Sequence, residues 1–189
     1  MKSSRILAAA IAGSIALTAA AALVPPPARA ELAKGATAPM FATQAALAGK
    51  AFRFDLASAL KRGPVVLYFY PKAFTEGCTL EARAFAEASG DFRKAGATVI
   101  GMSNDGLATL QKFSTSECRG KFAVGSATPA IVKGYDVDLK KLGVSTGLTT
   151  RTSYVIAPGS RIAFAHEDMD YKDHVRLTLA AVRDLKARR

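Results

Sequence analysis

One cysteine in this sequence lies where a strand is expected to give way to a helix, among residues whose types suit thiol chemistry. Cys78 ends the segment 71–78 (PKAFTEGC), which follows the apolar run 65–70 (VVLYFY) and precedes a stretch with helical spacing. At a helix N-terminus, unpaired backbone N–H groups and the helix dipole favour a thiolate, which is the nucleophilic form of cysteine. The position therefore suits an activated nucleophile.

Three residues just before Cys78 have types that such a site would use. Pro71 is placed to end the strand and to shield the sulfur from water, and Gly77 to let the backbone turn tightly and present its N–H group. Thr75 lies three residues before the cysteine, so its hydroxyl can lie beside a thiolate and bind a small polar substrate. From local position alone, a buried cysteine acting as a small hydrophobe is equally well supported.

The pattern of Pro71, Thr75 and Cys78 after an apolar strand resembles the active-site signature of the peroxiredoxins. Segments 70–72 (YPK) and 77–81 (GCTLE) resemble the Q-type branch, the bacterioferritin comigratory protein group. The resemblance extends over most of residues 35–187. It includes the segment 151–156 (RTSYVI), similar to the strand that carries the family's active-site arginine, and the helix start 171–175 (YKDHV). It implies a thioredoxin-like α/β fold, with a mixed central β-sheet flanked by helices.

The resemblance also implies a thiol-dependent peroxidase in which Cys78 attacks a hydroperoxide and becomes a sulfenic acid. Thr75, Arg151 and backbone N–H groups would hold the two peroxide oxygens. The implied partners are hydrogen peroxide or an organic hydroperoxide and a thioredoxin-like dithiol donor. No metal, haem or other cofactor is implied, and the family resemblance favours a monomer. Glu81 is expected either to orient Arg151 through a charge-assisted hydrogen bond or to be an exposed acid in the first helical turn.

The second cysteine, Cys118, is the candidate resolving residue. Many Q-type members carry a resolving cysteine five positions after the peroxidatic one, but this chain has Arg83 there. Cys118 lies near the end of a helix expected to start around Asp105, and its polar neighbours predict an exposed thiol. The resemblance favours a Cys78–Cys118 disulfide as the intermediate. The alternative is resolution by an outside thiol, with Cys118 a bystander.

The first thirty residues have the three parts of a signal peptide. Lys2 and Arg5 give a positive start, residues 6–24 are mainly apolar, and the proline run 25–27 precedes Ala28-Arg29-Ala30. This pattern predicts cleavage after Ala30, export to the periplasm and no stable membrane association afterwards. An uncleaved membrane anchor is the alternative. Residues 31–189 then form a single domain.

The net charge of +11 is not concentrated in any one segment. The leader holds three basic residues and no acid, which leaves 23 basic and 15 acidic residues, or +8, in the rest. These are scattered, with no long run and no interleaved aromatic residues, so they indicate a solvated basic surface rather than a nucleic-acid site. Histidines and acids gather between His166 and His174, but their spacing matches no standard metal-ligand set. Asp170 and Asp173 are interpreted as helix caps.

Hydrophobic periodicity predicts strands alternating with helices, then a hairpin and a last helix. The expected elements are a strand pair around 48–50, a helix over 56–61 capped by Asp55, strands at 65–70 and 97–102, a helix over 79–95, a helix capped within 103–105, a strand at 122–124, a helix over 130–135, a loop-rich segment 136–150, a hairpin over 151–165 and a helix capped by Asp170.

Two other functions fit parts of this pattern. A periplasmic thiol–disulfide oxidoreductase shares the expected fold, but the chain lacks the Cys-x-x-Cys that such an enzyme usually has. A non-catalytic thioredoxin-fold binding or chaperone module would hold its two cysteines in a static disulfide. Fast consumption of peroxide by the reduced protein distinguishes a peroxidase from both.

Overall fold

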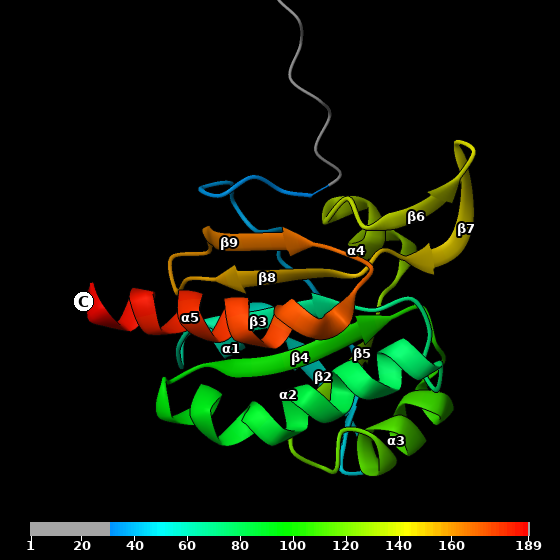
Figure 1. Cartoon of the computed structure of the whole chain (residues 1–189), viewed down its shortest axis with the longest axis horizontal. Coiled ribbons are helices and arrows are strands. Elements are labelled where there is room, and N and C mark those ends of the chain that lie inside the picture. The colour runs from blue at the N-terminus through cyan, green and yellow to red at the C-terminus, as the bar shows by residue number, and fades with distance from the viewer. Residues whose placement is uncertain (1–30, 189) are drawn as a thin grey trace, which may run out of the picture.

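The computed structural model describes residues 31–188 (Figure 1). The leader predicted over residues 1–30, its cleavage after Ala30 and the alternative of a membrane anchor all fall outside this range. Among residues 31–188, no helix combines the length and the apolar character that crossing a bilayer requires.

A seven-stranded mixed sheet forms the centre of the described chain, with the strand order β2-β1-β5-β4-β3-β8-β9. Strands β3, β4 and β5 are parallel, and the other pairs are antiparallel. The strands are β1 (Ala42–Leu47), β2 (Lys50–Asp55), β3 (Val65–Phe69), β4 (Thr98–Ser103), β5 (Ala123–Ser126), β8 (Thr152–Ile156) and β9 (Ile162–Glu167). A separate hairpin pairs β6 (Asp138–Lys141) with β7 (Val144–Thr149). The mixed sheet agrees with the fold class expected from the sequence.

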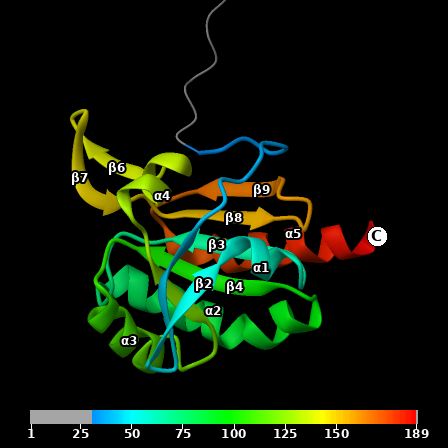
Figure 2. The same ribbon diagram turned by 180° about the vertical axis from the view of Figure 1, so that it is seen from behind.

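Helices cover both faces of this sheet. They are α1 (Leu56–Leu60), α2 (Glu76–Lys94), α3 (Leu107–Ser116), α4 (Pro129–Gly134) and α5 (His174–Ala187), with a 3₁₀ turn η1 (Tyr171–Asp173) before α5. Figure 1 shows α2 and α5 in front of the sheet, and Figure 2 shows α1 on the opposite side. Two core clusters result, one packed against α2, α3 and α5 and the other against α1 and α4.

The central strand β3 is buried on both faces, as its continuous apolar sequence predicted. Val65, Leu67 and Phe69 point into the α1/α4 cluster, while Val66 and Tyr68 point into the α2/α3/α5 cluster. This two-sided burial fixes the strand that leads directly into the segment before Cys78.

The long helix α2 starts three residues earlier than expected, so that Cys78 is its third residue. Its buried face includes Phe85 and Phe92, as predicted, but Leu80 is 37% exposed. The helix ends as expected at Gly96, which has φ +83°, and the Ala97 N–H donates to the Phe92 carbonyl.

Three features differ from the sequence expectation. The segment 136–150, expected to be rich in loops, contains the β6–β7 hairpin. Leu142 at its turn and Val144 are exposed. Its polar and apolar residues follow no pattern that predicts strands. The helix expected from Asp105 begins at Leu107 and has Gly106 at its N-cap with no side-chain cap bond. Asp170 caps η1 rather than α5 itself. Asp55 caps α1 as expected, accepting a bond from the Ser58 N–H.

Candidate active site

Cys78 lies in the first turn of α2 with 2% of its surface exposed. The N-cap residue Thr75 makes no side-chain cap bond, and the Thr79 N–H makes the first bond of the helix, to the Thr75 carbonyl. The N–H groups at the start of a helix have no partner within it, so those of Gly77 and Cys78 are free of intrahelical bonds. This turn is therefore suited to bind negative charge beside the sulfur.

Asp105 holds the loop that leads into this turn. Its Oδ2 accepts hydrogen bonds from the Ala73 N–H and the Ser103 hydroxyl, each at 2.8 Å. Phe74, next in the chain, has φ +64°, a left-handed conformation that is unfavourable for a bulky residue. The Asp105 bond to the neighbouring residue helps to hold this strained loop. The sequence had suggested a capping role for Asp105, which the structure replaces with this one.

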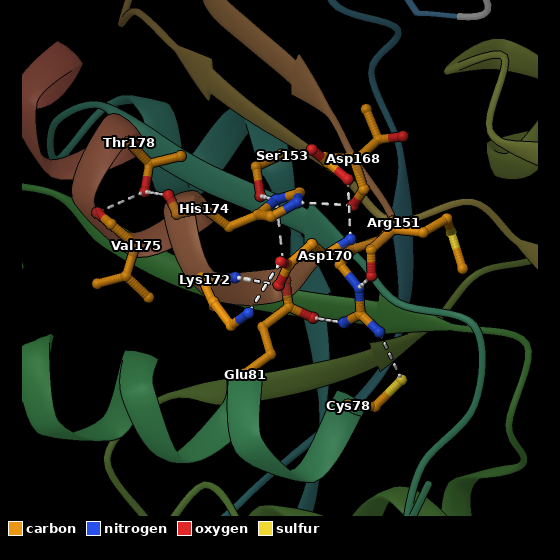
Figure 3. Close-up of polar contacts among 12 residues, drawn as sticks. Cys78, Glu81, Arg151, Ser153, Asp168, Asp170, Lys172, His174, Val175 and Thr178 are labelled. Carbon is orange, nitrogen blue, oxygen red and sulfur yellow. Dashed lines mark hydrogen bonds and ion pairs between the residues drawn. The ribbon is translucent and has the colours of Figure 1, made fainter. Parts of the chain in front are cut away.

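Strand register brings Arg151 to the same end of the sheet. Strand β8 runs antiparallel to β3 with Thr152 opposite Phe69, so Arg151 lies just beyond the end of β3, where the chain turns toward Cys78. Its side chain is 5% exposed and its Nη2 lies 3.6 Å from the Cys78 sulfur (Figure 3). Its Nε donates to the Met169 carbonyl at 3.0 Å. The structure thus brings together the two residues that the sequence pattern linked.

Glu81 is the third member of this group and is fully buried. Its Oε2 pairs with Nη1 of Arg151, which is the contact that an orienting role requires, and its burial rules out the exposed alternative. Burial raises the pKa of Glu81 above the usual carboxyl range, and the contact with Arg151 opposes that rise. Burial disfavours the charged form of Arg151, yet the charges of Glu81 and Cys78 outweigh this and raise the pKa of the guanidinium. Arg151 therefore remains a cation beside the sulfur.

Gly77 contributes space rather than an unusual backbone conformation. It is the second residue of α2, and its φ is not positive, so the tight turn expected there is wrong. A Cβ atom at this position would lie 3.2 Å from Nη2 of Arg151. A side chain at this position would therefore press on the guanidinium, which passes this close to the helix on its way to Cys78.

Thr75 and Pro71 lie in the chain segment between β3 and Cys78. The Thr75 hydroxyl donates to the Lys72 carbonyl at 2.9 Å, and its side chain is exposed. Pro71 follows Tyr70, whose N–H still bonds the Met102 carbonyl, so the proline marks the end of sheet pairing as predicted. The Thr75 hydrogen is committed to Lys72, which leaves its oxygen lone pairs available as acceptors.

A buried histidine lies behind the Glu81–Arg151 pair. His174, the first residue of α5, places its Nδ1 2.8 Å from the Ser153 hydroxyl and its Nε2 2.9 Å from the Asp168 carbonyl (Figure 3). Its Nδ1 is also 3.8 Å from Oε1 of Glu81. The histidine thus borders the cluster of charged groups without touching Cys78.

Cys118 differs most from its expected setting, because it is fully buried rather than exposed. It follows α3 and packs in the same apolar cluster as Cys78, with aromatic side chains from β3, α2 and α3. Both cysteines are free thiols in this structure. The prediction of an exposed thiol was wrong because it rested on the polar residues beside Cys78's candidate partner, Cys118. Glu117 and Arg119 point away from the thiol and form ion pairs with Arg83 and Glu87.

The sequence matches the AhpC/TSA family over residues 35–165. This chain belongs to the AhpC/TSA family. Peroxiredoxin Bcp of Xanthomonas campestris is 28% identical over 75% of this chain and 96% of its own length. Peroxiredoxin Q of Sedum lineare is 29% identical over 83% of this chain and 81% of its own length. These relatives place the chain in the Q-type, bacterioferritin comigratory protein branch of the peroxiredoxins.

Solved structures agree with this assignment. Peroxidoxin BcpB from Mycobacterium tuberculosis has a TM-score of 0.69 and 29% identity, covering 80% of this chain and 96% of that one. A structure of Xanthomonas campestris bacterioferritin comigratory protein, described by its alkyl peroxide reduction activity, has a TM-score of 0.66 and 25% identity, covering 76% and 91%. The thioredoxin-like α/β fold of the peroxiredoxins, expected from the sequence, is confirmed.

Two members of the cluster of histidines and acids near the last helix, His174 and Asp170, have structural partners in this peroxiredoxin. Both ring nitrogens of His174 contact protein groups, and Asp170 caps η1. Among residues 31–188, no three His, Cys, Asp or Glu side chains are arranged to hold a metal ion.

His174 should make the stability of this peroxiredoxin depend on pH. Burial lowers the pKa of His174 from 6.5 to about 4. Between pH 6.5 and about 4, His174 is therefore protonated in the unfolded chain and neutral in the folded chain. The free energy of unfolding should therefore fall as the pH drops through this window, with a slope of up to about 1.4 kcal/mol per pH unit from this group.

Urea unfolding of the parent and of His174→Gln at several pH values measures this contribution. Burial raises the pKa of Glu81, so Glu81 gives the opposite slope, but it is present in both proteins and largely cancels in the comparison. We expect the parent to lose stability more steeply than the variant between pH 6.5 and about 4. Parallel stability curves for the two proteins would contradict the assignment.

Proposed function

We propose that this chain reduces hydrogen peroxide and organic hydroperoxides with Cys78 as the attacking thiol. A thioredoxin-like dithiol donor then restores the enzyme. The observation that carries the proposal is the position of the Arg151 guanidinium. Glu81 holds this group, and Nη2 of Arg151 lies 3.6 Å from the sulfur of Cys78, which is at the N-terminus of α2. Membership of the peroxiredoxins makes the chain a thiol-dependent peroxidase, and the alkyl peroxide reduction described for the Xanthomonas campestris protein supports organic substrates.

The first step is attack of the Cys78 thiolate on the nearer oxygen of ROOH. A sulfur–oxygen bond forms and the oxygen–oxygen bond breaks, so the sulfur is oxidised by two electrons to a sulfenic acid. The RO⁻ group leaves and takes up a proton to become an alcohol, or water when R is hydrogen. Arg151 and the free N–H groups of the first turn of α2 stabilise the negative charge as it passes from sulfur to the leaving oxygen.

Thr75 orients the peroxide as a hydrogen-bond acceptor. Because its hydroxyl donates to the Lys72 carbonyl, its oxygen is left to accept the hydrogen of ROOH. The peroxide would then be held between one acceptor, Thr75, and one donor, Arg151. Two such contacts of opposite type distinguish the O–H end of the peroxide from the R end.

We propose that Cys118 resolves the sulfenic acid. Its sulfur attacks that of Cys78, a disulfide forms and water leaves. Cys118 is fully buried, so both ends must move, and the first turn of α2 must unwind. The ion pairs Arg83–Glu117 and Arg119–Glu87 tie the segment on both sides of Cys118 to α2, so they keep it near the helix while the turn opens.

The variant Cys118→Ser tests this step. After one equivalent of peroxide, the parent should lose both free thiols and gain one disulfide, while the variant should accumulate the sulfenic acid of Cys78. Intact mass under non-reducing conditions and trapping with dimedone distinguish these products. If the variant turns over with a dithiol donor as fast as the parent, Cys118 is a bystander and an outside thiol resolves Cys78.

Stopped-flow consumption of peroxide by the reduced protein tests the proposed activity. We expect a second-order rate several orders of magnitude above that of a free thiol such as glutathione. A rate near that of the free thiol would instead favour a disulfide oxidoreductase or a non-catalytic module. Running the assay with hydrogen peroxide and cumene hydroperoxide establishes which substrate is preferred.

We further propose that the protein works as a monomer in the periplasm. The three-part leader over residues 1–30 supports export, with cleavage after Ala30. The reductant would then be a periplasmic dithiol protein. N-terminal sequencing of the protein recovered from a periplasmic fraction tests the compartment and the cleavage site together.

A further inference from the structure

The active-site arginine depends on a backbone carbonyl in an exposed segment. Residues 168–170 connect β9 to η1, and all three are exposed, with Met169 52% exposed. The Met169 carbonyl nevertheless accepts the Nε–H bond that fixes one edge of the Arg151 guanidinium. Exposed connections are usually mobile, so something must hold this carbonyl in place.

Two bonds to the preceding residue supply that restraint. The Asp168 N–H donates to the Arg151 carbonyl at 3.2 Å, which extends the pairing of β8 with β9 by one step. The Asp168 carbonyl faces Nε2 of His174 at 2.9 Å. Consecutive carbonyls of this segment, those of Asp168 and Met169, therefore bind a histidine and the arginine (Figure 3).

The hydrogen-bond partners of His174 determine where its ring proton lies. A backbone carbonyl can only accept, so Nε2 must carry the hydrogen that bonds Asp168. The neutral ring then has an acceptor at Nδ1, and the Ser153 hydroxyl donates to it at 2.8 Å. The ring is fully buried at the start of α5, and the Thr178 hydroxyl donates to the His174 carbonyl at 2.6 Å. A neutral, immobile donor thus faces the exposed segment from inside the fold.

We propose that His174 is a positioning residue for Arg151, acting through the backbone carbonyls of Asp168 and Met169. The inference rests on the proposed function, in which Arg151 holds the peroxide and stabilises the leaving oxygen. The His174 ring fixes the Asp168 carbonyl, the next carbonyl fixes Nε of Arg151, and Glu81 fixes Nη1. With these two edges held, Nη2 is the part of the guanidinium directed to Cys78.

Three variants separate positioning from stability. His174→Phe keeps a buried ring but removes the donor to Asp168. His174→Gln keeps an amide N–H that can reach the same carbonyl. Thr178→Val serves as the matched control, because it perturbs the first turn of α5 without touching residues 168–170. All three are compared with the parent in urea unfolding, so that only folded protein enters the kinetic comparison.

We expect His174→Phe to lower the rate of peroxide attack by Cys78 about tenfold or more, since small displacements of a catalytic group cost this much. His174→Gln should recover most of the parental rate, and Thr178→Val should stay within about twofold of it. In an Arg151→Lys background, which removes the Nε contact, His174→Phe should have little additional effect. The proposal would be overturned if His174→Phe lowered the rate by the same factor in the Arg151→Lys background as in the parent. It would also be overturned if folded His174→Phe kept the parental rate.

A readout without peroxide keeps this inference separate from the proposed function. The Nε–H of Arg151 should give a ¹⁵N–¹H signal protected from exchange with water by the Met169 carbonyl. That protection should be lost in His174→Phe and kept in His174→Gln and Thr178→Val. If the parent failed to consume peroxide, the proposed function would be rejected, but the Arg151 Nε–H signal would still test the positioning role of His174. An unchanged Nε–H signal in His174→Phe would reject that positioning role alone.

Discussion

Replacing Cys78 with serine should reduce peroxide consumption to the uncatalysed background, a loss of about 10⁴-fold or more for removal of a nucleophile. Serine fits the same buried space in the first turn of α2, so the fold should be kept. A hydroxyl cannot replace the sulfur, because it is far less nucleophilic and cannot form the sulfenic acid. Stopped-flow kinetics with purified, reduced protein measures the loss.

Cys118→Ser provides the matched control for this prediction. It removes the other thiol of the same apolar cluster but should leave the first attack on peroxide unchanged within about twofold. A Cys78→Ser protein that kept the parental rate would show that another group carries the reaction. Equal losses in both single variants would indicate that the first step requires the two sulfurs together.

Arg151→Lys should slow the attack of Cys78 on peroxide by about 100-fold or more, the range found when one donor to a developing oxyanion is removed. Lysine keeps the positive charge that the buried Glu81 carboxyl requires, so the protein should remain folded. A single ammonium group cannot contact Glu81, the Met169 carbonyl and Cys78 together, as the guanidinium does. The second-order rate with hydrogen peroxide measures this loss.

Two further variants show whether charge or geometry causes that loss. Arg151→Met leaves Glu81 buried without a partner and should cost several kcal/mol of stability, about 3–5 kcal/mol for such a change. Combining it with Glu81→Gln should restore stability but not the rate. A parental rate in Arg151→Lys would show that a positive charge suffices and that the three contacts of the guanidinium are unimportant.

Residues close in the sequence made the core of this site predictable. The apolar run of β3, the proline after it and the cysteine at the start of α2 are local features, and the family pattern added Arg151 from far along the chain. The register of β8 against β3 explains why that distant arginine arrives beside Cys78. Glu81 remained undecided in the sequence because burial, which separates its two possible roles, is set by tertiary packing.

The parts that could not be predicted depend on backbone groups and on tertiary packing. The Met169 carbonyl has no signature in the side-chain sequence, and neither does the Asp105 contact with the Ala73 N–H. His174 could have been noticed as the one histidine at the start of an amphipathic helix, but its partners lie in other elements. Cys118 was predicted to be exposed because its neighbours are polar, yet these form ion pairs across the surface while the thiol points inward.

Four of the tyrosines of this protein divide between the two faces of the sheet, and the fifth, Tyr171, lies in η1. The chain has five tyrosines and no tryptophan. Tyr68 and Tyr70 stack on Phe85 and Phe113 in the cluster that contains both cysteines, whereas Tyr135 and Tyr154 belong to the opposite cluster. Within the described chain, the hydroxyl of Tyr68 has no hydrogen-bond partner, so replacing Tyr68 with phenylalanine removes no bond.

The intensity of tyrosine emission from the protein should therefore respond to changes in the packing around the two cysteines. We expect unwinding of the first turn of α2 to disturb the packing around Tyr68 and Tyr70 and so to change the intensity of their emission. The Tyr68→Phe and Tyr70→Phe variants assign the changing part of the spectrum. Oxidation and re-reduction can then be followed in real time in the unlabelled protein, without a dye attached to either cysteine.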